Sequence, residues 1–402
     1  MPDSISGADT AWMLLSAALV VLMTPALGLF YGGLVRAKNA LNTLLHSLFL
    51  LGAISLQWAL VGYSLVFAPG NPLIGGLDYV GLRGVGAEPN VTYAATIPHT
   101  AFMMFQLAFA VITPALTSGA FAERKKFSAF VLFSLLWSTL VYDPVAHWVW
   151  GSGGWMRDLG ALDFAGGTVI HVTSGMSALT CALVLGKRKR VVSEPHNAVL
   201  TMLGAALLWF GWFGFNGGSA LTVGPLAAHA VATTHLAASA GAVTWVGANY
   251  LRTGKVSVLA IGLGGVAGLV AVTPAAGFVG MDAAIALGAI AGVVCSWAVE
   301  RAKAWADDTL DVFGVHGVGG FLGAVGTGVL ATTSVNAAGA DASLHLVGVQ
   351  TLSAGVAALY SAVATWGILK LVGLATDLRV HSDVEEQGLD EAQHGERAYW
   401  FK

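Results

Sequence analysis

The sequence predicts an all-α polytopic membrane protein with eleven transmembrane helices, arranged as two inverted five-helix repeats plus a final helix. Its 402 residues are 56% hydrophobic and only 10% charged, whereas soluble domains contain about 25% charged residues. The 52 glycines, together with abundant Ala, Ser and Thr, favour helices that pack closely through small residues over a barrel of alternating strands.

Each predicted span is a continuous apolar segment close to or above the length that a membrane-crossing helix needs, about 20 residues. In chain order the segments are 11–35, 41–67, 99–122, 127–148, 163–186, 197–219, 226–251, 256–275, 281–299, 311–332 and 346–374.

The basic residues support this number of spans. If all eleven segments cross the membrane, every Lys and Arg except Arg83 and Arg157 falls on one side. A wrong number of spans would mix the basic residues between the two sides. By the positive-inside rule, we expect an inner-membrane or plasma-membrane protein with its N-terminus outside and its C-terminus in the cytoplasm.

Eleven spans accommodate two five-helix halves of opposite orientation and one remaining helix, an arrangement that places a substrate path between the halves. The predicted transmembrane domain, 1–374, contains repeat one at about 11–186, repeat two at about 197–332 and the final helix at about 346–374. The acidic segment 375–402 is predicted to be a cytoplasmic tail.

One carboxylate and one imidazole occur at matching places in the two halves. The fifth segment carries Asp163 and His171, and the tenth carries Asp311 and His316, with spacings of eight and five residues. At a rise of about 1.5 Å per residue, Asp163 and His171 start roughly 12 Å apart, too far for a direct hydrogen bond. We therefore expect Asp163 to cap a helix at the membrane face and His171 to lie near mid-membrane, where an ionisable group is usually functional. Chance placement of two histidines is the alternative.

Several distinctive runs of sequence extend over nearly the whole chain. The runs are TPALGLFYGGLVRAKN (24–39), PVAHWVWGSGG (144–154), GALDFAGGTVIH (160–171), GWFGFNGGS (211–219), VTPAAG (272–277), DVFGVHGVGG (311–320) and GLDEAQHGERAY (388–399). In this order they resemble signatures of the ammonium transporter, methylammonium permease and Rhesus protein family, and they are closest to its microbial ammonium transporter branch.

The resemblance implies a homotrimer in the lipid bilayer with a pore through each protomer, which moves ammonium, ammonia or methylammonium for nitrogen uptake. It further implies that the tail is regulatory and that a PII-type protein binds at the cytoplasmic face. We expect no enzymatic activity, no cofactor, no metal and no nucleic-acid partner.

The family's functional positions match particular residues of this chain. Trp150 and Ser219 match an outer recruitment site, with Gln106 in the same vestibule. Phe109, which also belongs to the recruitment site, and Phe215 match a stacked phenyl gate. The remaining matches are His171 and His316 with a twin-histidine pore, Asp163 with a structural carboxylate at the recruitment site, and Thr273 with a position near the pore wall.

Each match also has a structural alternative, because a lone His171 is more often a buried core histidine and Trp150 could belong to an interfacial aromatic belt. Three alternatives to a transporter also stay open. The first is an ammonium sensor of the same fold that conducts little. The second is a membrane cytochrome with His171 and His316 as haem ligands. The third is a carrier that rocks between two states.

Overall fold

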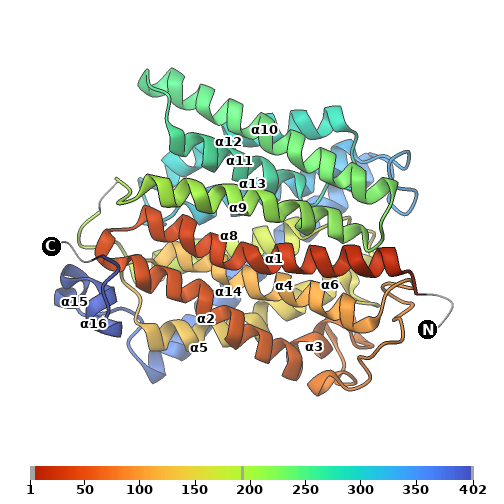
Figure 1. Cartoon of the computed structure of the whole chain (residues 1–402), viewed down its shortest axis with the longest axis horizontal. Coiled ribbons are helices and arrows are strands. Elements are labelled where there is room, and N and C mark those ends of the chain that lie inside the picture. Colours follow the sequence, from red (N-terminus) through yellow and green to blue (C-terminus); the bar gives the residue numbers. More distant parts are fainter. Residues whose placement is uncertain (1–4, 192–193, 400–402) are drawn as a thin grey trace.

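The computed structural model describes residues 5–191 and 194–399, so Lys402, one of the basic residues assigned to the cytoplasmic side, lies outside the described part. The chain forms an elongated bundle in which the long helices run along the long axis (Figure 1). The first half forms α1 (Gly7–Leu34), α2 (Ala40–Gln57), α3 (Tyr63–Phe67), β1 (Gly70–Asn71), β2 (Ile74–Gly75), α4 (His99–Thr117), α5 (Phe127–Trp137), α6 (Asp143–Trp150), α7 (Trp155–Asp158) and α8 (Thr173–Leu185).

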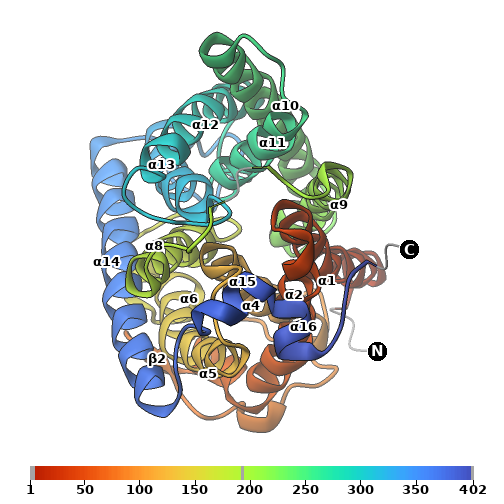
Figure 2. The same cartoon turned by 90° about the vertical axis from the view of Figure 1, so that its left-hand side faces the viewer.

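The second half forms the remaining helices, which are α9 (Ala198–Gly217), α10 (Pro225–Thr253), α11 (Val258–Val272), α12 (Met281–Ala302), α13 (Val318–Leu330), α14 (Leu344–Ala375), α15 (Ser382–Gln387) and α16 (Leu389–His394). Viewed along the bundle, α1–α8 and α9–α13 occupy separate parts, and α14 lies along one side (Figure 2).

Within the part of the chain that the structure describes, four segments of π-helix interrupt or precede the α-helices. Trp58–Gly62 joins α2 to α3, and Ser138–Tyr142 joins α5 to α6. Gly167–Val172 leads into α8, and Phe313–Gly317 leads into α13. Such segments occur frequently at functional sites, and here two of them carry His171 and His316.

A helix lies in each of the eleven predicted segments. Within the described residues, nine helical runs are long and apolar enough to cross a membrane. The other two are α10, which is 29 residues long but falls short in apolarity, and α11, which has only 15 residues. The multi-pass helical fold is therefore confirmed, whereas the number of eleven crossings stays a prediction.

The first helix of each half runs in the opposite direction to the other. Asn197, just before α9, donates its backbone N–H to the Gly33 carbonyl near the end of α1 at 3.1 Å. At the other end of both helices, Trp12 Nε1 donates to the Gly217 carbonyl at 3.2 Å. The two helices approach closely because a Cβ at Gly204 would lie 2.3 Å from the Phe30 backbone nitrogen. This antiparallel pair is the orientation that inverted repeats require.

The tail folds back onto the bundle as two short helices, seen at the C-terminal end in Figure 2. Asp390 accepts backbone N–H groups of Leu41 and Asn42 at 3.1 and 2.8 Å, and so caps the first turn of α2. The Leu389 N–H donates to Asn39 Oδ1 at 2.8 Å. The end of the bundle that carries this contact is called the tail end below, and the opposite end, which holds α1's first residue and the loop 68–98, is called the N-terminal end.

Candidate functional site

An open cavity, called the vestibule below, lies at the N-terminal end of the bundle. Four residues that the sequence assigned to recruitment, Gln106, Phe109, Trp150 and Ser219, come from three separate helical regions and meet in its wall. The full lining is Phe67, Thr92, Tyr93, Phe102, Phe105, Gln106, Phe109, Val149, Trp150, Arg157, Asp163, Phe164, Ser219 and Leu221.

Asp163 closes the start of the π-helical segment that carries His171. Its Oδ1 accepts the N–H groups of Gly166 and Gly167 at 2.8 and 2.6 Å, and its Oδ2 accepts those of Thr168 and Val169 at 2.8 and 3.1 Å. The first N–H groups of a helix lack intrahelical partners, and here the carboxylate is the hydrogen-bond acceptor for four of them. The helix begins at Gly167 and not at Asp163, where the predicted span began.

The polar groups of the vestibule are held in defined positions. Trp150 Nε1 donates to the Asp163 carbonyl at 3.0 Å, which orients the indole against the cavity. Ser219 Oγ donates to the Phe215 carbonyl at 2.9 Å, so its lone pairs stay free to accept. Gln106 Oε1 is buried and has no partner among the described residues. The vestibule therefore offers an aromatic face and two oxygen acceptors to a small cation.

Phe109 and Phe215 separate the vestibule from the interior. Their ring centroids lie 4.5 Å apart with an interplanar angle of 90°. The resemblance implies a stacked pair, and this part of the prediction is wrong because the rings pack edge to face. This geometry is preferred since the positive edge of one ring meets the negative face of the other. Trp150 lies 6.1 Å from Phe109, on the vestibule side.

His171 and His316 meet behind the gate. Their Nδ1 atoms are 3.2 Å apart, and both side chains are buried. The Phe215 ring lies 6.0 Å from the His171 ring at an interplanar angle of 13°. The start of α8 and the π-helical segment Phe313–Gly317 approach through glycines, because a Cβ at Gly175 would lie 2.1 Å from the Gly317 nitrogen. Small residues thus let the two backbones meet closely enough for the imidazoles to touch.

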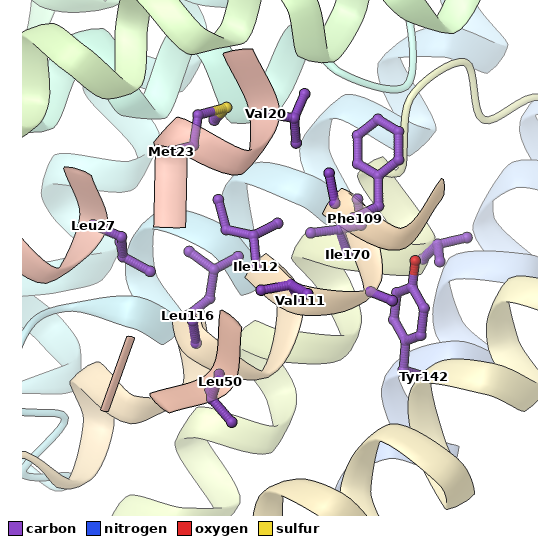
Figure 3. Packing of buried hydrophobic residues seen from close by; sticks show 14 of the residues in the cluster. Val20, Met23, Leu27, Leu50, Phe109, Val111, Ile112, Leu116, Tyr142 and Ile170 are labelled. Carbon is purple, nitrogen blue, oxygen red and sulfur yellow. The ribbon is translucent and has the colours of Figure 1, made fainter. Parts of the chain in front are cut away.

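The two histidines open into an apolar cavity. Of its lining residues, Met23 and Leu27 from α1 and Ile112 and Leu116 from α4 are labelled in Figure 3, where Leu27 points toward Ile112 and Leu116. Its complete lining is Met23, Leu27, Phe30, Tyr31, Ile112, Leu116, His171, Leu208, Trp212, Phe215, Leu263, Val266, Leu310, Val315 and His316. These aliphatic residues are not among the predicted site residues, because the sequence of a membrane helix does not distinguish a cavity-facing Leu from a lipid-facing one.

Thr273 is hydrogen-bonded to Trp212, which is not among the site residues predicted from the sequence. Trp212 Nε1 donates to Thr273 Oγ1 at 3.0 Å, and Thr273 Oγ1 donates to the Leu269 carbonyl at 2.7 Å. Trp212 lines the cavity and lies 5.5 Å from the His171 ring, whereas Thr273 is not among the lining residues. Trp212 precedes Phe215 by three residues, and this spacing places both on one helix face.

The counterpart of Asp163 in the second half is Asp308. The prediction that Asp311 occupies the matching position is therefore wrong. Asp308 Oδ2 accepts the Phe313 N–H at 2.6 Å, five residues further on, as Asp163 Oδ2 accepts that of Thr168. Asp308 therefore stands eight residues before His316, as Asp163 stands eight residues before His171. Burial, and then the charge of Asp311, raise the pKa of Asp308 to about 7.

Asp308 lies at the tail end of the bundle. It lines an open cavity there, and Leu310 belongs both to this cavity and to the apolar cavity below the histidines. The vestibule, the phenyl gate, the histidine pair and this second opening thus follow one another through the bundle, with Phe109 shared by the first two and Leu310 by the last two.

Comparison with known proteins agrees with this arrangement. A model of the Ammonium Transporter Family matches residues 11–399. The ammonium transporter of Bacillus subtilis is 52% identical over 398 residues, which cover 97% of this chain and 98% of that protein. Ammonium transporter Amt1 of Archaeoglobus fulgidus is 45% identical, with coverage of 98% and 100%.

Solved structures share the fold. The crystal structure of Saccharomyces cerevisiae Mep2 matches with a TM-score of 0.87 and 36% identity, covering 95% of this chain and 89% of that one. A structure named Sensor Amt Protein matches with a TM-score of 0.89 and 28% identity, with coverage of 96% and 98%. This chain therefore belongs to the ammonium transporter family, whose members are multi-pass membrane transporters and not enzymes.

Proposed function

We propose that this protein moves ammonium across the membrane by binding the cation in the vestibule, removing its proton and passing ammonia through the twin-histidine pore. The observation that carries the proposal is the His171–His316 pair, with Nδ1 atoms 3.2 Å apart, inside an otherwise apolar cavity behind two phenyl rings.

Recruitment rests on the vestibule. The faces of Trp150 and Phe109 attract a small monovalent cation by a cation–π interaction worth about 2 kcal/mol once the cation is desolvated. Ser219 Oγ and Gln106 Oε1 accept its N–H groups. Methylammonium retains three of these N–H groups, so it is expected to be a substrate as well.

Energetics decide that the cation does not pass intact. Moving an ion of this size into an apolar bore costs on the order of 20 kcal/mol by the idealised Born estimate. Removing a proton from an amine whose pKa lies about two units above ambient pH costs only about 3 kcal/mol. Ammonia and a separated proton are therefore the less costly route past Phe109 and Phe215.

The histidine pair suits a neutral guest. With Nδ1 facing Nδ1, one ring must donate and the other accept, so the accepting ring is neutral, and two neutral rings satisfy one another in this contact. Such a pair can donate to ammonia and can also relay a proton. Thr273 supports the pore wall by fixing Trp212, and Asp163 supports the vestibule by capping the helix that carries His171.

The assembly and its regulation extend the proposal. We expect a homotrimer in the inner or plasma membrane, with the N-terminal end outside and the tail end in the cytoplasm. The docked α15 and α16 present residues 375–399 at the tail end, where a PII-type regulator would bind.

Methylammonium uptake tests the proposal in cells that lack their own transporters. Replacing both His171 and His316 with alanine should abolish uptake while the protein remains in the membrane. Undiminished uptake in the double variant would exclude the pore role. Purified protein without a Soret band excludes the haem alternative.

A second candidate function is ammonium sensing, which the likeness to the structure named Sensor Amt Protein supports. A sensor would bind ammonium in the vestibule but conduct little. Ammonium flux and current in proteoliposomes separate the two functions, because only a transporter gives a flux that rises with protein density. The same measurement shows whether ammonia, ammonium, or ammonia with a relayed proton is the net species.

A further inference from the structure

The two π-helical segments that do not contain the pore histidines also hold a polar pair. Gln57 directly precedes Trp58–Gly62, and Asp143 directly follows Ser138–Tyr142. Gln57 Nε2 donates to Asp143 Oδ2 at 2.8 Å. Neither residue lines the vestibule or the apolar cavity. The bundle therefore contains a second contact between polar side chains at paired π-helical segments, away from the pore.

Asp143 is fully buried, with 0% of its surface exposed. Among the described residues it has no ion pair, and Gln57 is its only side-chain hydrogen-bond partner. The charged or titratable groups on the elements packed against α6 make no bond to it, and they are Tyr63, Tyr142, Arg157, Asp158 and His171. On α6 itself, the ring nitrogens of His147 instead contact the Val66 and Asn71 carbonyls at 2.7 and 2.9 Å. An ionised carboxylate in such surroundings is strongly disfavoured, because no ion pair among the described residues compensates its charge.

The unpartnered atoms of the pair are complementary. Asp143 Oδ1 and Gln57 Oε1 are both buried without a partner. Two bare acceptors cannot satisfy each other, but a protonated Oδ1 becomes a donor and Gln57 Oε1 is the acceptor that lacks one. A neutral acid and an amide thus match through two hydrogen bonds, one already formed and one that is direct or passes through a water molecule.

The backbone leaves room for this pair. A Cβ at Gly62 would lie 2.8 Å from Gln57 Oε1 and 3.0 Å from Nε2, so only glycine admits the amide there. Trp58 Nε1, Ser138 Oγ and Tyr142 OH are also buried without partners in the same two segments. Clustered unpartnered polar groups of this kind are typically joined by buried water, which makes about three hydrogen bonds per molecule.

We propose that Gln57 and Asp143 form a second proton-binding site within the membrane, in which Asp143 is a neutral carboxylic acid held by the Gln57 amide and by buried water. The binding step adds one proton to Asp143 Oδ1 and breaks no other bond. This site goes beyond the transport function proposed above and does not depend on the role of the histidines.

Infrared spectroscopy of the purified full-length protein in lipid vesicles at pH 7 tests the proposal, since a carboxylic acid has a C=O band that a carboxylate lacks. The spectrum of wild type minus Asp143→Asn should contain this acid band, and the band should shift in D2O because water reaches the site. Wild type minus Asp282→Asn, which changes an exposed aspartate, should contain carboxylate bands only.

A second variant keeps the test independent of the folding of Asp143→Asn. Gln57→Met removes the hydrogen bond to Oδ2 at similar size, and the acid band should persist at a higher frequency. Carboxylate bands in the Asp143 difference spectrum would overturn the proposal in favour of a bound monovalent cation. An acid band whose frequency Gln57→Met does not change would overturn the acid–amide pair. An acid band that does not shift in D2O would overturn the buried water.

Discussion

Replacing Asp163 with asparagine is expected to loosen the vestibule and the start of the His171 helix. The carboxylate accepts four backbone N–H groups, two on each oxygen. Asparagine keeps one oxygen, so two N–H groups would face an NH2 group that cannot accept. Each buried donor left without a partner costs about 1–3 kcal/mol, which gives roughly 2–6 kcal/mol for the two.

The lower part of that range is expected, because asparagine is itself a good helix cap. A loss of about 2 kcal/mol corresponds to a roughly 30-fold change in the equilibrium between ordered and disordered vestibule. Methylammonium uptake and the melting temperature of the purified protein should both fall. Asp282→Asn, at the exposed start of α12, is the control and should change neither. Wild-type uptake and stability in Asp163→Asn would refute the capping role.

Two further substitutions address the helix contact and the tail end. Gly175→Ala should push α8 away from the segment that carries His316 and abolish methylammonium uptake, because its Cβ would lie 2.1 Å from the Gly317 nitrogen. The Cβ of Gly52→Ala would have no atom within 4 Å, so this variant should behave as wild type, and equal uptake by both variants would contradict the close approach. For Glu123, burial raises the pKa, but hydrogen bonds from Arg36 and then the charges of Arg36 and Arg188 outweigh it and hold the pKa below the ordinary 4.5. Its stabilising effect is therefore fully present above pH 4.5 and is lost as pH falls through the lowered pKa. Glu123→Gln should have a lower melting temperature than wild type at pH 7, and its melting temperature should decline less on acidification. Parallel curves of melting temperature against pH for the two proteins would argue against this role.

The sequence predicted the helical segments because long apolar stretches leave the backbone no partner but itself within a membrane. It did not reveal the π-helical segments. A π-turn adds one residue to a helix without changing its apolar composition, so the pattern of hydrophobic residues before and after it looks uninterrupted. The start of the fifth helix at Gly167, four residues after Asp163, and the edge-to-face packing of Phe109 and Phe215 depend on such local geometry and on the surrounding side chains.

The correspondence between the two halves was visible in the sequence but was assigned to the wrong aspartate. Asp311 is the aspartate within the predicted tenth span, but it stands five residues before His316, whereas Asp163 stands eight before His171. Asp308 stands eight residues before His316, as Asp163 does before His171. Spacing to the histidine, rather than proximity, identifies the capping aspartate, because each carboxylate accepts N–H groups at the start of the segment that carries the histidine.

Equal spacing has a geometric consequence for the pore. Asp163 caps its helix at the N-terminal end of the bundle and Asp308 caps its helix at the tail end, so each histidine lies the same number of residues inward from an opposite end. Two side chains carried inward equally from opposite ends meet near the middle, where their Nδ1 atoms are 3.2 Å apart. Because each residue contributes about 1.5 Å along a helix, inserting a single residue between either aspartate and its histidine would displace one imidazole by about half the contact distance and turn it by roughly 100° away from its partner.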